Sequence, residues 1–154
     1  MNTFVVVASM AGFILLAAVV FLFTNLFFGE DKTIDIDRLA KAIATIENWD
    51  GHSVGAAGER GKYQISLSVW SQHTNKTFVL AASNHPLAVA EQREVVIKHL
   101  EWIKGCLPGL KLKRSAFDIA LVYTAGYGNV AAKRISPEKR DYANRVATIY
   151  YCSP

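Results

Sequence analysis

Glu47 is the residue of this sequence best placed to do acid–base chemistry, because it ends an apolar stretch just before a glycine-rich segment. A carboxyl group among apolar side chains keeps its proton near neutral pH, since burial disfavours the charged form. Such a group can act as a general acid and donate its proton to a leaving oxygen. On spacing alone, the simpler interpretation of Glu47 is an ordinary exposed glutamate at a helix end. The downstream sequence, however, favours a general acid.

The segment before Glu47 is predicted to be a helix that delivers this side chain to a cleft. Between residues 34 and 46, apolar side chains recur three and four positions apart, which is the spacing of an amphipathic helix. Asp35 or Asp37 can cap its start. Glu47 falls in the last turn, and the four glycines among residues 49–61 predict a loop or a small irregular hairpin directly after it.

Helix start and stop signals recur along the rest of the chain. They predict a short helix from about Ser66, a long helix capped by Ser83 or Asn84 with Pro86 in its first turn, a helix capped by Ser115, and a final helix that Ser136 caps and Pro137 begins. Glycines within residues 125–128 separate the last two helices. Little sequence is left for a large sheet, so the expected fold class is mainly α.

Three segments, in this order, resemble the lysozyme-like superfamily, and in particular SLT-type lytic transglycosylases and goose-type lysozymes. Residues 61–64 (GKYQ) resemble the Gly-x-x-Gln motif that follows the catalytic glutamate of that family. Residues 122–126 (VYTAG) resemble its Ala-Tyr-Asn-Ala-Gly element, and residues 141–146 (DYANRV) resemble its terminal tyrosine-containing helix. The resemblance covers residues 38–151. It implies a lysozyme-like domain that cleaves the MurNAc–GlcNAc bond of peptidoglycan with Glu47 as general acid.

The same resemblance implies which side chains meet the substrate. Gln64 would hydrogen-bond the glycan or order the site, and Tyr123 would approach Glu47 and the reacting sugar. Two positions depart from the family pattern: Asn48 stands where serine is usual, and Thr124 where asparagine is usual. Both keep a hydrogen-bonding group, so both are expected to contact substrate.

Aromatic side chains near these positions can offer apolar faces to sugar rings. Trp49, Tyr63 and Tyr127 are the three expected to do so. As alternatives, Gln64 satisfies only backbone groups of its loop, and Tyr123 is a core aromatic with its hydroxyl bound to a partner.

The presence and position of a second carboxylate decide whether the bond is cleaved by hydrolysis or by transglycosylation. Inverting hydrolysis needs a base roughly 6.5–9.5 Å from the acid, and a covalent intermediate needs a carboxylate at roughly 5–5.5 Å. Glu59 is the expected second carboxylate, since its GERG segment resembles the acidic loop of goose-type lysozymes; Asp50 is the other candidate. Alternatively, Glu59 only pairs with Arg60 or Lys62. Without a second carboxylate the 6-hydroxyl of the substrate attacks and forms an anhydro sugar, so hydrolase and transglycosylase both stay open.

An uncharged apolar segment, residues 4–28, precedes the expected domain. As a helix it would be roughly 37 Å long, against roughly 30 Å for the hydrocarbon core of a bilayer. Residues 1–29 are therefore predicted to be a single-pass membrane anchor (or an uncleaved signal), followed by the lysozyme-like domain over residues 30–154. A cleaved signal peptide is one alternative, although no basic region precedes the segment, and a buried helix of a soluble protein is the other.

Two considerations place the domain on opposite sides of the membrane. Lys32, Arg38 and Lys41 follow the apolar segment and no Lys or Arg precedes it, which favours a cytoplasmic domain under the positive-inside rule. Cleavage of peptidoglycan requires the periplasmic or extracytoplasmic side, and that is the expected location. Residues 98–154 hold ten Lys/Arg against four Asp/Glu. This charge either suits anionic cell-wall glycan or is only the solvated helix surface of a basic protein. Nucleic acid is not expected as a partner, because only the charge supports it.

Metal and cofactor chemistry are not expected. The four histidines, His52, His73, His85 and His99, lack metal-binding spacing and are expected to be structural or at the surface. No nucleotide-binding motif is visible. Cys106 and Cys152 are too few for a disulfide scaffold or a zinc site; they either pair in an oxidising compartment or remain separate thiols. The alternative function, which the departures at Asn48 and Thr124 favour, is a non-catalytic membrane-anchored protein that keeps the lysozyme-like fold and binds peptidoglycan or assists assembly.

Overall fold

The structure is a computed structural model that describes residues 33–47 and 54–153. The predicted membrane segment, residues 4–28, lies outside the described residues, as do Asn48, Trp49 and Asp50. Among the residues that are described, no helix has both the length and the apolar character needed to cross a bilayer. Ile34–Pro154 forms one compact unit of the chain and is described by itself.

This unit is built from helices, which confirms the mainly α fold class. The elements are α2 (Ile36–Glu47), α3 (Leu67–His73), η1 (Phe78–Ala82), α4 (Pro86–Cys106), η2 (Leu107–Leu110), α5 (Ala116–Ala125), α6 (Tyr127–Ala131) and α7 (Pro137–Cys152), where η marks a 3-10 helix. The β structure found among the described residues is one isolated antiparallel bridge between Arg60 and Ile65.

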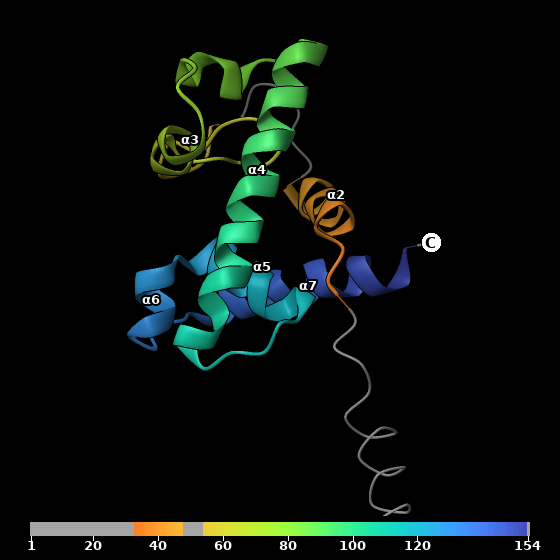
Figure 1. Cartoon of the computed structure of the whole chain (residues 1–154), viewed down its shortest axis with the longest axis vertical. Coiled ribbons are helices and arrows are strands. Elements are labelled where there is room, and N and C mark those ends of the chain that lie inside the picture. The colour runs from red at the N-terminus through yellow and green to blue at the C-terminus, as the bar shows by residue number, and fades with distance from the viewer. Residues whose placement is uncertain (1–32, 48–53, 154) are drawn as a thin grey trace, which may run out of the picture. The chain divides into compact units, whose positions relative to one another are not determined.

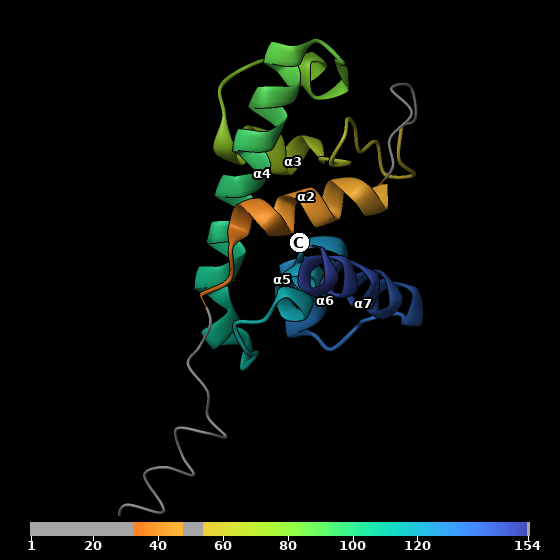
Figure 2. The ribbon, with the colours of Figure 1, turned by 90° about the vertical axis from the view of Figure 1, so that its right-hand side faces the viewer.

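Helix α4 runs through the whole unit, and the other helices gather around it (Figure 1). Helix α3 and η1 contact α4 and each other, while α5 contacts α4, α6 and α7. Helix α2 lies between these two groups, against both α4 and α7, as Figure 2 shows from the side. The apolar face of α2 supplies Leu39 and Ile43, which are fully buried in the common core with Leu100, Ile119 and Val146. The end of α2 that carries Glu47 is thereby held between the two groups.

Most of the predicted helix starts are confirmed. Asp35 accepts a hydrogen bond from the backbone N–H of Arg38 (3.1 Å). Ser66 and Ser115 cap α3 and α5 in the same way. Ser136 precedes α7 as expected, but its side chain makes no capping bond to the helix.

The predicted cap of α4 is wrong. His85 stands at the cap position, and its Nδ1 accepts the N–H of Leu87 (3.3 Å). Ser83 Oγ instead accepts the N–H of His85 (3.2 Å). The start is shifted because Pro86 occupies the first turn, where its fixed φ favours the helix and its missing N–H costs nothing.

Both cysteines are free thiols in this structure. Cys106, half-buried, ends α4, and Cys152, exposed, ends α7. Of the two states left open by the sequence, the structure therefore has the unpaired one.

A candidate active-site cleft around Glu47

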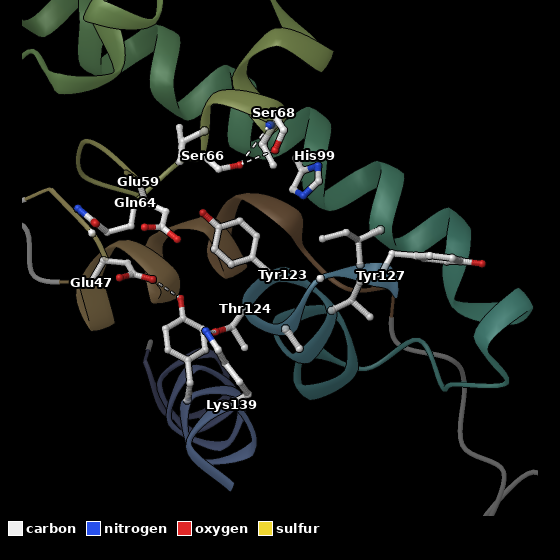
Figure 3. A pocket seen from close by; sticks show the side chains of 18 of the residues that line it. Glu47, Glu59, Gln64, Ser66, Ser68, His99, Tyr123, Thr124, Tyr127 and Lys139 are labelled. Atoms are coloured by element: carbon white, nitrogen blue, oxygen red, sulfur yellow. Dashed lines mark hydrogen bonds between the residues drawn. The ribbon is translucent and has the colours of Figure 1, made fainter. Parts of the chain in front are cut away.

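An open cleft of about 630 Å³ lies at the C-terminal end of α2. Its lining comes from α2, the loop of residues 55–66, α3, α4, the α5–α6 region and α7. Segments that are far apart in the sequence therefore meet here, and they include parts of all three stretches that resemble the lysozyme-like superfamily. Figure 3 shows Glu47, Glu59 and Gln64 at one end of this cleft.

Glu47 is half-buried in the last turn of α2, as predicted, and its carboxyl group faces the cleft. Tyr142 Oη, from α7, donates a hydrogen bond of 2.6 Å to Glu47 Oε1. Burial raises the pKa of Glu47, and it outweighs the lowering effects of this hydrogen bond and of the positive charge on Lys139. Burial thus shifts the pKa of Glu47 in the direction that the sequence predicts.

Gly61 is required by the turn that positions Gln64. It has φ = +77°, and a Cβ at this position would lie 1.9 Å from the backbone oxygen of Ala81. The turn is closed by a hydrogen bond from Gln64 N to Gly61 O (3.0 Å), and the Arg60–Ile65 pair flanks it. Any side chain at position 61 would therefore push the loop away from η1.

Replacing Gly61 by alanine is expected to lower the free energy of unfolding by about 2–4 kcal/mol, because left-handed backbone strain adds to the clash with Ala81. Urea unfolding followed by circular dichroism measures the change. Gly58→Ala is the matched control: Gly58 also has positive φ (+85°), but a Cβ added there would meet nothing within 4 Å. An equal loss in both variants would show that strain alone is responsible and would contradict the role of the close approach.

Gln92 fastens this loop from α4 and was not predicted from the sequence. Its side chain is fully buried. Its Oε1 accepts the N–H of Lys62 (3.0 Å), and its Nε2 donates to the backbone oxygens of Leu80 (3.1 Å) and Ser83 (2.9 Å). One side chain of α4 therefore ties the Gly61–Gln64 turn to η1 and to Ser83, the residue that follows η1.

Gln64 lines the cleft, but its amide is also used within its own loop. Its Nε2 donates to Gly61 O (3.1 Å), and its backbone has φ = +46°. A left-handed conformation is costly for any residue but glycine, and such strain is typical of positions where a particular side chain is needed. The described geometry is compatible with both predicted roles of Gln64, the contact to substrate and the ordering of the loop.

Glu59 stands near Glu47 in the same end of the cleft (Figure 3), and its negative charge contributes to the raised pKa of Glu47. Glu59 Oε2 accepts the N–H of Ala57 (2.9 Å). Among the ion pairs formed by described residues, none involves Glu59, so the expected alternative of pairing with Arg60 or Lys62 is not found. Its role as the second carboxylate stays a prediction.

Tyr123 lines the cleft, whereas Tyr63 does not. Tyr123 Oη donates a hydrogen bond of 2.6 Å to the backbone oxygen of Tyr63. Burial, with the nearby negative charge of Glu47, raises the pKa of Tyr123, so the phenol stays neutral and remains the donor. The Tyr63 ring is only 4 % exposed. The expectation that this ring offers a face to sugar is therefore wrong, because the turn at Gly61 points it into the core.

Thr124 also lines the cleft, and Lys139 of α7 accompanies it. Lys139 Nζ donates to Thr124 Oγ1 (3.2 Å), so this hydroxyl is joined to a positive charge close to Glu47. Lys139 was not singled out in the sequence, since a lysine in the first turn of a predicted surface helix has no distinctive pattern.

Three further ring side chains line the cleft beyond Tyr123: His99, Trp102 and Tyr127. Tyr127 was expected as a sugar-facing ring, and its position in the cleft agrees with that expectation. His99 was expected to be structural or at the surface; it is buried, and one side of it borders the cleft. Trp102 was not singled out, although it is an exposed tryptophan near the C-terminal end of a long helix.

The site is thus a cleft in a mainly helical domain that holds one half-buried acid, a second carboxylate, a lysine and several aromatic rings. Among the residues described, no group of three or more His, Cys, Asp or Glu side chains is arranged to hold a metal ion. Comparisons with models of protein families, with curated proteins and with solved structures gave no match.

Proposed function

We propose that this domain is a lysozyme-like glycosidase that cleaves the MurNAc–GlcNAc bond of peptidoglycan, as a muramidase or a lytic transglycosylase, with Glu47 as general acid. The observation that carries the proposal is Glu47 itself: a half-buried carboxyl group with a raised pKa, at a helix end, in a large cleft. The motif resemblance supports it independently, because residues from all three resembling segments line this cleft.

The surroundings of Glu47 suit proton donation. The protonated carboxyl group gives its proton to the leaving glycosidic oxygen while positive charge develops on the sugar ring. Glu47 becomes a carboxylate in that step, and the Tyr142 hydroxyl and the Lys139 ammonium then stabilise its new charge. The same two groups hold back the rise in the pKa of Glu47, so the acid can lose its proton during the reaction.

Two completions of the reaction are consistent with the cleft. If Glu59 acts as base, it removes a proton from water, which attacks the anomeric carbon and gives a reducing end. If Glu59 only holds the loop at Ala57, the 6-hydroxyl of the substrate attacks instead and returns its proton to the Glu47 carboxylate, which gives an anhydro end. The domain is proposed to act without a cofactor, on the extracytoplasmic side, held there by residues 4–28.

A second candidate is a non-catalytic peptidoglycan-binding protein with the same fold. Three polar groups that a catalyst would direct at substrate are occupied by protein partners: Glu59 by Ala57, Gln64 by Gly61, and Thr124 by Lys139. Glycan pull-down without any cleavage would favour this candidate.

The deciding experiment incubates the full-length protein with purified peptidoglycan and identifies the soluble products by mass spectrometry. Anhydro ends and reducing ends differ by one water, so the masses separate transglycosylase from hydrolase. If no soluble fragment is released although the protein sediments with peptidoglycan, the enzymatic proposal is contradicted and the binding protein is favoured.

The pH profile tests the electrostatics of Glu47. A general acid works while it is protonated, so activity should fall as the pH rises through the pKa of Glu47. Lys139 lowers that pKa, and Lys139→Met should therefore shift this alkaline limb to higher pH. Arg140→Met, which removes an exposed positive charge next to Lys139 but outside the cleft lining, is the control and should leave the limb in place. A shift to lower pH in Lys139→Met would contradict the assignment of Glu47 as the acid.

A further inference from the structure

A row of rings leads along the cleft away from Glu47. The centroid of the Tyr123 ring lies 6.1 Å from that of His99, His99 lies 5.4 Å from Trp102, and Trp102 lies 6.2 Å from Tyr127. In Figure 3, Tyr127 and Glu47 lie on opposite sides of Tyr123. The cleft therefore extends well beyond the acid, and its far part is bordered by aromatic surface.

Trp102 is held in place before any ligand arrives. Its ring is stacked on the His99 ring with an interplanar angle of 12°, and His99 Nδ1 is 3.1 Å from His73 Nε2. Burial lowers the pKa of His99 to about 4, so the stacked imidazole is neutral at neutral pH. Trp102 is nonetheless 39 % exposed, and Tyr127 is 41 % exposed. A rigid exposed ring binds a ligand at little cost in conformational entropy.

Charge is distributed unevenly over the cleft. The charged residues among its described lining are Glu47, Glu59 and Lys139, which belong to α2, the following loop and α7. The charged neighbours of Trp102 on α4 do not line the cleft: Glu101 and Lys104 pair with each other (3.5 Å), and Lys98, one turn before Trp102, pairs with Glu94. The aromatic end therefore suits an uncharged ligand with an apolar face, whereas carboxylates of a substrate find their countercharge at Lys139.

We propose that Trp102 and Tyr127, whose rings are tilted by 54° to each other, form a platform on which an uncharged N-acetylhexosamine ring of the glycan strand stacks, at the end of the cleft away from the bond that is cleaved. This inference rests on the proposed function. A sugar ring has an apolar face of C–H groups and a rim of hydroxyls. The platform supplies the apolar surface. Ser66 and Ser68, which border the same cleft, supply hydroxyl partners elsewhere along it. The domain thus recognises an extended oligosaccharide and not a disaccharide alone.

The test separates binding from cleavage. In the full-length Glu47→Gln variant, which keeps the cleft but lacks the acid, isothermal titration calorimetry measures the affinity for N-acetylglucosamine oligomers of two and six units. The hexamer should bind more tightly than the dimer. Adding Trp102→Leu should weaken hexamer binding about tenfold, the loss expected for one aromatic contact. It should also remove most of the change in tryptophan fluorescence that hexamer causes.

Tyr151→Leu, which removes an exposed aromatic residue of α7 outside the cleft lining, is the matched control and should bind hexamer as the parent does. Trp102→Phe keeps an aromatic ring beside His99 and controls for a loss of binding caused by misfolding. Its loss of hexamer affinity should lie between those of the parent and Trp102→Leu. The platform is overturned if hexamer and dimer bind equally, if no oligomer binds, or if Trp102→Leu binds hexamer as tightly as the parent. Tight binding of hexamer through Trp102 without cleavage of peptidoglycan by the unmodified protein would overturn the proposed catalysis and leave the platform standing.

Discussion

Replacing Glu47 by glutamine is expected to lower the rate of peptidoglycan cleavage by about 10²–10⁴-fold, which is the usual contribution of a general acid. Glutamine has nearly the same shape, and its amide oxygen can still accept the hydrogen bond from Tyr142 Oη. The fold should therefore persist while the transferable proton is lost. Release of soluble fragments from peptidoglycan measures the rate, and thermal unfolding followed by circular dichroism verifies the fold.

Glu94→Gln is the matched control for this variant. Glu94 is an exposed glutamate of α4 that pairs with Lys98 at the surface and does not line the cleft. Its replacement should leave the rate within about twofold, as is usual for surface substitutions worth a few tenths of a kcal/mol. Undiminished cleavage by a folded Glu47→Gln variant would remove Glu47 from the mechanism.

Replacing Gln92 by leucine is expected to have the largest effect on stability, a loss of about 3–5 kcal/mol in the free energy of unfolding. Leucine fills a similar volume but gives up three partly buried hydrogen bonds to backbone groups, at Lys62, Leu80 and Ser83. Each unsatisfied buried group costs about 1–3 kcal/mol, and relaxation of the loop recovers part of the sum. Urea unfolding of the full-length protein measures the loss.

Gln72→Leu provides the matched comparison, because Gln72 is an exposed glutamine on α3. Its replacement should change the free energy of unfolding by no more than about 0.5 kcal/mol. If Gln92→Leu were as stable as Gln72→Leu, the turn that carries Gln64 would be held by other contacts, and the fastening role of Gln92 would be wrong.

The helices were predictable from the sequence because their signals are local. Apolar spacing located α2 to within a residue or two, and the serines before α3 and α5 cap those helices as expected. The N-cap of α4 was not predictable in this way. Ser83 and Asn84 both have side chains suited to capping, but His85, directly before Pro86, takes the position. Local sequence gives the existence of an element more securely than it gives its first residue.

The site was predictable only where it follows from a helix end or a motif. Glu47 could be located because it ends an amphipathic helix, but its hydrogen bond to Tyr142 joins residues 95 positions apart. The role of Gln92 could not be predicted, because a single glutamine within a helix normally faces water. Only the fold shows which backbone groups its side chain binds. The mistaken expectation for Tyr63 has the same origin, since the direction of its ring depends on how the Gly61 turn docks on η1 and α4.

Two tyrosines of α7 hold the two ends of α2. Tyr142 binds Glu47 at the C-terminal end, while Tyr150 Oη accepts the N–H of Asp35 (3.0 Å) at the N-terminal end, where Arg38 also donates to the backbone oxygen of Ser153. The two helices therefore run in opposite directions. The start of α2 and the end of α7 lie on one side of the domain, and the length of α2, about 18 Å, separates them from the carboxyl group of Glu47. A reporter protein fused after residue 153 would emerge beside the start of α2 and leave the cleft unobstructed.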